Sequence, residues 1–83
     1  MKHTARTPSQ IGSIIRRIRT DKNMTQTDLA EKVGTVQKKI STIETGQSGA
    51  RIDTICNIMA ALDLDIVITQ RDKSTSQNIE DIF

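Results

Sequence analysis

The sequence predicts an all-α domain of four short helices that ends in a single β-strand. Apolar residues recur at the three- and four-residue spacing of amphipathic helices in four successive segments between residues 7 and 62. Residues 64–70, with the sequence LDIVITQ, instead alternate and are rich in β-branched residues, which is typical of a strand. We therefore expect a domain over residues 7–70, preceded by a flexible basic arm over 1–6 and followed by a disordered acidic tail over 71–83.

Size and composition restrict the chain to one small domain with an aliphatic core. The sequence has 83 residues, and its only aromatic residue is Phe83. No apolar run approaches the roughly 18 residues that span a membrane. The N-terminal segment MKHTARTPSQ lacks an apolar signal region, so we expect a cytoplasmic protein. The single cysteine, Cys56, cannot form an internal disulfide, which fits a reducing compartment.

Charge is distributed unevenly along the chain. Residues 1–51 hold ten Lys and Arg against four Asp and Glu, a net charge of +6. Residues 52–83 hold two Lys and Arg against six Asp and Glu, a net charge of −4. A basic half joined to an acidic half indicates two different partners, one of them a polyanion.

The first helix is expected to begin at Thr7. This threonine is an N-cap, Pro8 occupies the first helical position and Gln10 the third. The expected buried face consists of isoleucines: Ile11, Ile14, Ile15 and Ile18. Gly12 destabilises a helix interior by roughly 1 kcal/mol relative to alanine, so either another backbone passes close to it or the helix start tolerates it. Asn23 is expected to end the segment in a left-handed conformation.

The stretch from Thr25 to Gly46 predicts two short helices joined by a tight turn. Thr25 is a good N-cap, and Asp28 three residues later favours the positive end of the helix. Gly34 supplies a left-handed residue that ends the first of the two helices. The residues expected to face the core are Leu29, Ala30 and Val33 in the first helix, and Val36, Ile40 and Ile43 in the second. Together these features describe a helix-turn-helix.

The outer face of the second of these helices is polar, basic and free of acids. In a helix-turn-helix its N-terminal end enters the major groove, where lysine reaches guanine O6/N7 and glutamine bonds adenine N6/N7. We therefore expect base contacts from Gln37, Lys38 and Ser41. Lys39 and Thr42 flank them and are expected to contact a base or a phosphate. The alternative is a solvated polar face without function.

The start of the preceding helix is expected to bind the DNA backbone. Thr25, Gln26 and Thr27 offer hydroxyl, amide and backbone N–H groups that suit phosphate oxygens. Glu44 is the one acid near this surface and would repel phosphate if it pointed outward. We expect it to form a structural ion pair with Arg19 of the first helix.

The fourth helix is expected over about residues 52–62, and the strand follows it. The expected buried side of the helix is Ile52, Ile55, Cys56, Met59 and Leu62. The strand carries apolar residues at Leu64, Ile66, Val67 and Ile68. Because the sequence predicts no second strand and an unpaired strand is not stable, we expect two copies to pair in a symmetric homodimer. The alternative is that the helix runs on into a coil.

The C-terminal tail combines acidic and large apolar residues. Residues 71–78 are polar, and the chain then ends with three apolar side chains that form a possible partner-docking motif: Ile79, Ile82 and Phe83. The alternative is a frayed end without a role.

Nothing in the sequence supports catalysis or a cofactor. His3 is the only histidine and lies in the arm, and Cys56 lies on an apolar helix face, where cysteine is usually inert. The sequence has no metal-ligand cluster and no glycine-rich phosphate loop. We therefore expect no catalytic residue, no metal, no cofactor and no small-molecule substrate.

Across about residues 10–62 the chain resembles the Cro/xenobiotic-response-element type of helix-turn-helix. The matching positions are Arg19, Thr25-Gln26, Leu29-Ala30, Gly34, Ile40-Ser41, Ile43-Glu44 and Gly46. The resemblance implies a four-helix, lambda-repressor-like domain that binds palindromic double-stranded operator DNA, with the Arg–Glu pair in a structural role. That family usually has an apolar residue after the glycine and a capping residue next, whereas here the order is Thr35-Val36. We therefore expect a recognition helix that is capped by Thr35 and has Val36 inside.

The flanking segments resemble HipB-type antitoxins. The similarity lies in Thr7-Pro8-Ser9-Gln10, the strand Asp65-Ile66-Val67-Ile68 and a polar tail with an aromatic end. It implies a dimer paired through its strands, repression of the protein's own operon, and neutralisation of a HipA-like serine/threonine kinase toxin. One alternative is a stand-alone repressor or a restriction–modification controller, which usually ends in a fifth helix. Another is a protein-interaction module that has lost DNA binding.

Overall fold

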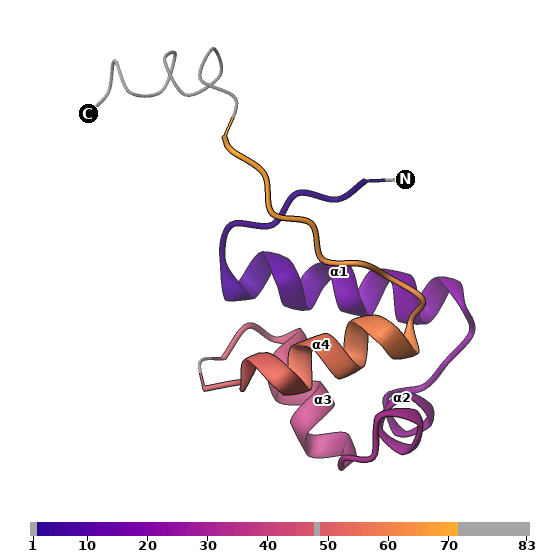
Figure 1. The fold of residues 1–83 in the computed structure, drawn as a ribbon. Helices are drawn as coiled ribbons and strands as arrows, with labels where there is room; N and C mark the ends of the chain where they lie inside the picture. The colour runs from indigo at the N-terminus through magenta and orange to yellow at the C-terminus, as the bar shows by residue number, and fades with distance from the viewer. Residues whose placement is uncertain (1, 48, 72–83) are drawn as a thin grey trace.

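The computed structural model describes residues 2–47 and 49–71. These residues contain four α-helices in the order α1 (Pro8–Asp21), α2 (Gln26–Val33), α3 (Gln37–Glu44) and α4 (Ile52–Ala61). Helix α1 packs against α3, and α2 packs against both α3 and α4. In Figure 1 α1 lies along one side of the domain, with α4 and α3 beneath it and α2 at the end near the α1–α2 turn. The predicted helical domain is confirmed.

The core lies where the four helices meet and is aliphatic. The fully buried large side chains come from every helix and from the C-cap of α4: Ile15, Leu29, Ile40, Ile58 and Leu62. Each such side chain stabilises the fold by about 1.5–3 kcal/mol when it leaves water. This core fixes α3 against α1 and α2, and so fixes the direction in which its outer face points.

The predicted helix ends are confirmed for α1 and α2. The Thr7 hydroxyl accepts a hydrogen bond from the Gln10 N–H at 3.1 Å. Thr25 and Asp28 form a capping box, in which each side chain accepts the other's backbone N–H at 2.9 Å. Asn23 has a φ of 59° and Gly34 a φ of 85°, the left-handed conformations that end the two segments.

Gly12 lies against the last turn of α3. A Cβ at this position would stand 2.7 Å from the Glu44 carbonyl oxygen and would also collide with that of Ile43. Of the two explanations for this glycine, close approach of another backbone is therefore correct. The contact brings α1 and α3 together at the place where Arg19 meets Glu44.

The prediction that Val36 is buried and Thr35 caps α3 is wrong. Helix α3 begins at Gln37, and Val36 is its N-cap, 61% exposed and without a side-chain capping hydrogen bond. The reason lies in the preceding turn. The N–H groups of Gly34 and Thr35 both donate to the Ala30 carbonyl at 2.9 Å, so Thr35 still belongs to the end of α2. The chain can enter the next helix only one residue later.

The predicted buried side of α4 is partly wrong. Ile52 is 75% exposed and Cys56 is exposed, whereas Ile58, which the pattern did not assign to the core, is fully buried. Ile55 and Met59 are partly buried against the core, and Leu62 is buried. Helix α4 packs on α2 and turns Ile55, Ile58 and Leu62 toward the core, while its first-turn isoleucine is turned to solvent.

Residues 64–70 form no strand within the part of the chain that the structure describes. Leu64 packs partly against the core, and its N–H donates to the Met59 carbonyl at 2.8 Å. Beyond it Ile66, Val67 and Ile68 are 50, 75 and 94% exposed. A ladder needs a second strand, so pairing between subunits stays a prediction. In Figure 1 this segment runs from the end of α4 past α1.

Two further predictions concern the two ends of the chain. The docking motif of Ile79, Ile82 and Phe83 lies outside the described residues. Residues 2–6 of the basic arm have no regular secondary structure, and the Arg6 N–H donates to the Gln10 side chain at 2.6 Å. In the described ranges no helix has the length and apolar character needed to cross a bilayer.

Candidate nucleic-acid interface

The outer face of α3 carries the predicted base-contacting residues. Gln37, Lys38 and Lys39 are exposed, while Ser41 and Thr42 are half-buried between them and the core. Ile40 and Ile43 hold the opposite face of the helix in the core. The structure therefore brings all five predicted positions together on one helix, whose N-terminal end presents a neutral amide and two ammonium groups.

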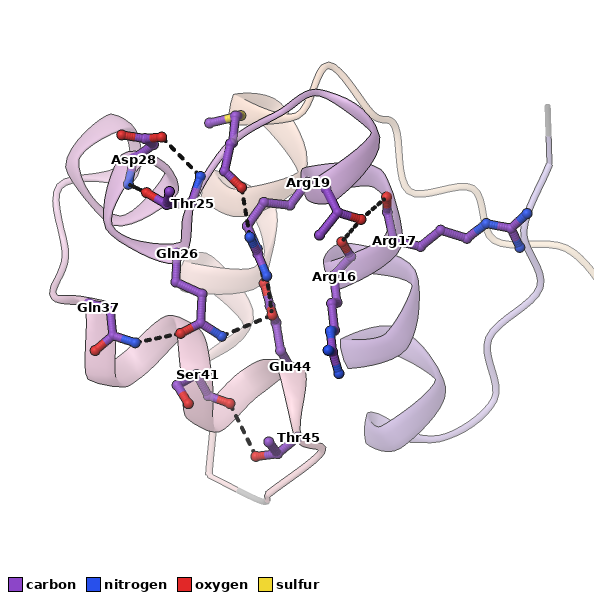
Figure 2. Close-up of polar contacts among 12 residues, drawn as sticks. Arg16, Arg17, Arg19, Thr25, Gln26, Asp28, Gln37, Ser41, Glu44 and Thr45 are labelled. Carbon is purple, nitrogen blue, oxygen red and sulfur yellow. Dashed lines mark hydrogen bonds and ion pairs between the residues drawn. The ribbon is translucent and has the colours of Figure 1, made fainter.

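The only acid of α3 is turned away from this surface. Glu44 is 7% exposed and forms a two-point ion pair with Arg19, with Nε to Oε2 at 2.6 Å and Nη2 to Oε1 at 3.1 Å. The third guanidinium nitrogen of Arg19 donates to the Met24 carbonyl at 2.6 Å. The predicted pairing is thus present (Figure 2), and it buries the carboxylate instead of leaving it on the outer face of α3.

A chain of hydrogen bonds runs from this ion pair to the start of α3. The Gln26 side-chain amide donates to Glu44 Oε1 at 3.1 Å, and its oxygen accepts a hydrogen bond from the Gln37 amide nitrogen. Figure 2 shows the three side chains in line. Because Glu44 can only accept, the Gln26 amide must turn its nitrogen toward it, which in turn sets the orientation of the Gln37 amide. Gln37 is left with its oxygen and one N–H unused by this chain.

The N-terminus of α2 lies beside the same surface. The Thr25 N–H is bonded to the Asp28 carboxylate, and this hydrogen bond lowers the pKa of Asp28 from its ordinary 3.8. From the sequence, the Thr25 backbone N–H is expected to suit phosphate, but it is bonded to Asp28. The Thr25 hydroxyl acts as an acceptor in the capping box, so the box does not use its proton. The backbone N–H groups of Gln26 and Thr27 have no acceptor inside the helix, as at any helix start.

The polar side chains of α3 and its C-cap, Thr45, differ in whether they already donate a hydrogen bond within the helix. The Thr42 hydroxyl donates to the Lys38 carbonyl at 2.9 Å, and the Thr45 hydroxyl donates to the Ser41 carbonyl at 3.1 Å. Their protons are thus committed to the helix, although their oxygens can still accept. Within residues 2–47 and 49–71, neither Lys38 nor Lys39 forms an ion pair with a carboxylate. The ammonium groups are available to an external anion.

The sequence reasoning missed two residues at the edge of this face. Val36 and Arg51 both line a hollow of about 310 Å³ beside α3, together with Lys39. Arg51 occupies the N-cap position of α4 without a side-chain capping hydrogen bond, and it forms an exposed ion pair with Asp53 at 3.2 Å. The sequence signal for the exposure of Val36 was Gly34. In the turn at this glycine the N–H groups of Gly34 and Thr35 both donate to the Ala30 carbonyl, so the turn includes Thr35 and Val36 becomes the N-cap of α3. In the described part of the chain, no group of three His, Cys, Asp or Glu residues could hold a metal.

Comparisons with known proteins agree with this geometry. Residues 15–68 match the family model described as helix-turn-helix. A HipB–O4 20mer complex is similar to the chain, with a TM-score of 0.79 and 24% identity, over 86% of this chain and 100% of that one. A HipA–HipB–O2–O3 complex gives a TM-score of 0.78 at 24% identity, over 86% of this chain and 100% of that one. At that identity the likeness shows the fold.

A second group of solved structures has a higher sequence identity to this chain but matches a smaller part of its length. The restriction–modification controller protein C.Esp1396I is 32% identical, with a TM-score of 0.66, over 75% of this chain and 80% of that one. No curated protein sequence matches the chain.

Proposed function

We propose that this chain is an antitoxin which represses its own operon. The premise is that it belongs to the helix-turn-helix family and is a DNA-binding regulator of that family. The observation that carries the DNA-binding part is the burial of Glu44 by Arg19. It leaves the outer face of α3 with lysines, an amide and hydroxyls, and with no carboxylate directed at a polyanion. Phosphate neutralised by lysine and arginine supplies much of the affinity of such a surface.

Base reading is assigned to the N-terminal half of α3. In the major groove adenine presents the N7 acceptor and the N6 donor side by side, whereas guanine presents two acceptors. Gln37, with its oxygen and one N–H free of the Gln26 bond, matches adenine and is mismatched to guanine. Lys38 reaches guanine O6/N7, and Ser41 accepts from or donates to the next base edge. Lys39 and Thr42 contact a base or the backbone.

Phosphate contacts are assigned to the start of α2. The hydroxyl of Thr25 and the backbone N–H groups of Gln26 and Thr27 stand at the positive end of the helix dipole. These contacts position the domain on the duplex without reading its sequence.

The reading unit is a homodimer paired through residues 64–70. The support is the exposure of Ile66, Val67 and Ile68, a β-branched run whose backbone forms no backbone hydrogen bond within residues 2–47 and 49–71. An antiparallel ribbon between two copies would cover these side chains and satisfy the backbone. The two α3 helices would then lie about 34 Å apart, one turn of DNA, and read a palindrome.

The second partner is a HipA-like serine/threonine kinase toxin, which the dimer neutralises. The support is the fold shared with HipB, including the chain in the HipA–HipB–O2–O3 complex. The alternative is a restriction–modification controller or a stand-alone repressor, which the likeness to C.Esp1396I favours.

Two experiments test these assignments. In the first, the chain is expressed with its neighbouring gene; copurification of a kinase-sized protein supports the antitoxin, and a chain that purifies alone supports the controller. In the second, a mobility shift at about 50 mM salt, where phosphate contacts are strong, measures binding to the upstream duplex and to a shuffled one. Equal binding to both would overturn sequence-specific repression.

A further inference from the structure

Val36 occupies a position where the fold gains nothing from valine. It is the N-cap of α3, with extended φ and ψ of −109° and 153°, and no side chain caps the helix start. Serine, threonine, asparagine and aspartate stabilise this position because their oxygens accept a free N–H of the first turn, which valine cannot do. The Val36 side chain does not compensate by packing in the core, because it is 61% exposed.

Residues that break a local rule of this kind are expected at functional sites. Val36 directly precedes Gln37, whose amide is held by Gln26 at the N-terminal end of the recognition helix. Its side chain also lines the hollow beside α3, whose rim carries Lys39 and Arg51. The exposed valine is thus an apolar spot inside a basic surface.

The charge around Val36 decides between two kinds of occupant. An apolar side chain of a protein partner would have to displace water from Lys38 and Lys39 without providing a counter-charge. A DNA duplex provides phosphates for those cations and, on the floor of its major groove, one apolar group, the C5-methyl of thymine. Apolar side chains contact that methyl in direct readout.

We propose that Val36 reads a thymine methyl group beside the base pair contacted by Gln37, so that it is a specificity-determining residue rather than a packing residue. The proposal rests on the DNA-binding function proposed above. Each half-site would then contain one thymine whose methyl is covered by the valine. Burying one methyl contributes about 0.8 kcal/mol, which corresponds to about fourfold in affinity.

The test uses DNA in which only the methyl is removed. A duplex selected by the full-length chain from a randomised library is resynthesised with deoxyuridine in place of each thymine in turn. Dissociation constants are measured for the unchanged chain and for Val36→Ala, Val36→Ser and Ile52→Ala. Ile52 is a matched control because it is 75% exposed, aliphatic and on the first turn of α4, outside the hollow that Val36 lines.

The expected result is one thymine per half-site at which uracil weakens binding by about fourfold. Val36→Ala and Val36→Ser should bind thymine and uracil at that position equally, while Ile52→Ala keeps the difference. Val36→Ser should at the same time raise the thermal midpoint by about 4–8 °C, because it supplies the missing cap. Reduced DNA selectivity would then come with a more stable fold.

Different results would overturn the reading role of Val36 and the proposed DNA binding. Selective DNA binding with no methyl-sensitive thymine, or with a sensitivity that both Val36 variants retain, overturns the reading role of Val36 and leaves the proposed function standing. Absence of selective binding at about 50 mM salt overturns the proposed function and this inference with it.

Discussion

The first residue of α2 is tied to the last residue of α3: the Gln26 amide donates to Glu44 Oε1 at 3.1 Å and accepts from Gln37. The side chain proposed to read adenine is therefore oriented, through Gln26, by a buried carboxylate. Glu44 itself is held by Arg19 from α1, so three helices contribute to the placement of one amide.

This chain of contacts predicts energetic coupling between Gln26 and Gln37. Gln37→Ala should weaken operator binding by about 1–3 kcal/mol and leave random DNA unaffected. Gln26→Ala keeps the backbone N–H assigned to phosphate but removes the amide that holds Gln37, so it should weaken operator binding and leave random DNA nearly unaffected. In a double-mutant cycle on the operator the pair should couple by about 0.5–3 kcal/mol. The pair Gln26 and Lys38 serves as the control and should be additive; equal coupling in both pairs would show that the hydrogen bond from Gln37 to Gln26 does not matter for binding.

Gly12→Ala should destabilise the fold strongly although alanine is the better helix former. The added methyl meets the backbone carbonyls of Ile43 and Glu44, which have no room to move apart without separating α1 from α3. Overpacking of this kind costs about 1–3 kcal/mol or more, seen as a lower urea midpoint. Gly34→Ala is the comparison, since its Cβ would meet nothing within 4 Å and only the left-handed φ of 85° opposes it. A milder effect for Gly12→Ala than for Gly34→Ala would disprove the close contact.

The Arg19–Glu44 pair should be costly to break on one side and cheaper to remove as a whole. Arg19→Met leaves a buried carboxylate without its partner, and such changes destabilise by about 3–5 kcal/mol. Arg19→Met combined with Glu44→Met should restore part of that loss in chemical denaturation, although Gln26 loses its acceptor. The exposed pair of Arg51 and Asp53 provides the contrast, and Asp53→Asn should change stability by less than about 1 kcal/mol.

Asp28 should make the fold sensitive to acid. Its folded-state pKa lies below the ordinary 3.8, chiefly because the Thr25 backbone N–H donates to the carboxylate. A lowered folded pKa means that the stabilisation is fully present above 3.8 and is lost as the pH falls through the folded value. Thermal midpoints measured from neutral pH down to acid should therefore fall less steeply in Asp28→Asn than in the unchanged chain. Parallel curves for the two proteins would show that the capping box does not titrate.

Much of the fold could be predicted because local signals and packing agree. Thr7, Thr25 and Gly34 act through the backbone of their own turn, so their roles follow from sequence spacing alone. The contact of Arg19 with Glu44 could be predicted because an outward-pointing Glu44 would repel phosphate, and because the resembled family has a structural Arg–Glu pair at these positions.

The errors arose where packing at longer range decides. Whether Val36 faces inward depends on where α2 ends, which is set by the two hydrogen bonds to the Ala30 carbonyl. The rotation of α4, which exposes Ile52 and Cys56 and buries Ile58, is set by contact with α2 rather than by its own apolar pattern. Short helices leave several apolar faces possible, and only the assembled neighbours select one.

The close approach at Gly12 has a bearing on how binding sites of different length could arise. Because α3 cannot tilt on α1 without separating the two backbones, each protomer would bind its half of a palindrome as a rigid body. In the proposed dimer the distance between the two α3 helices would instead depend on the segment that follows α4, around Asp63, whose φ of 61° turns the chain away from the helix. Substitutions confined to the segment around Asp63 would change the spacing between the two half-sites, while the bases read in each half-site stay the same.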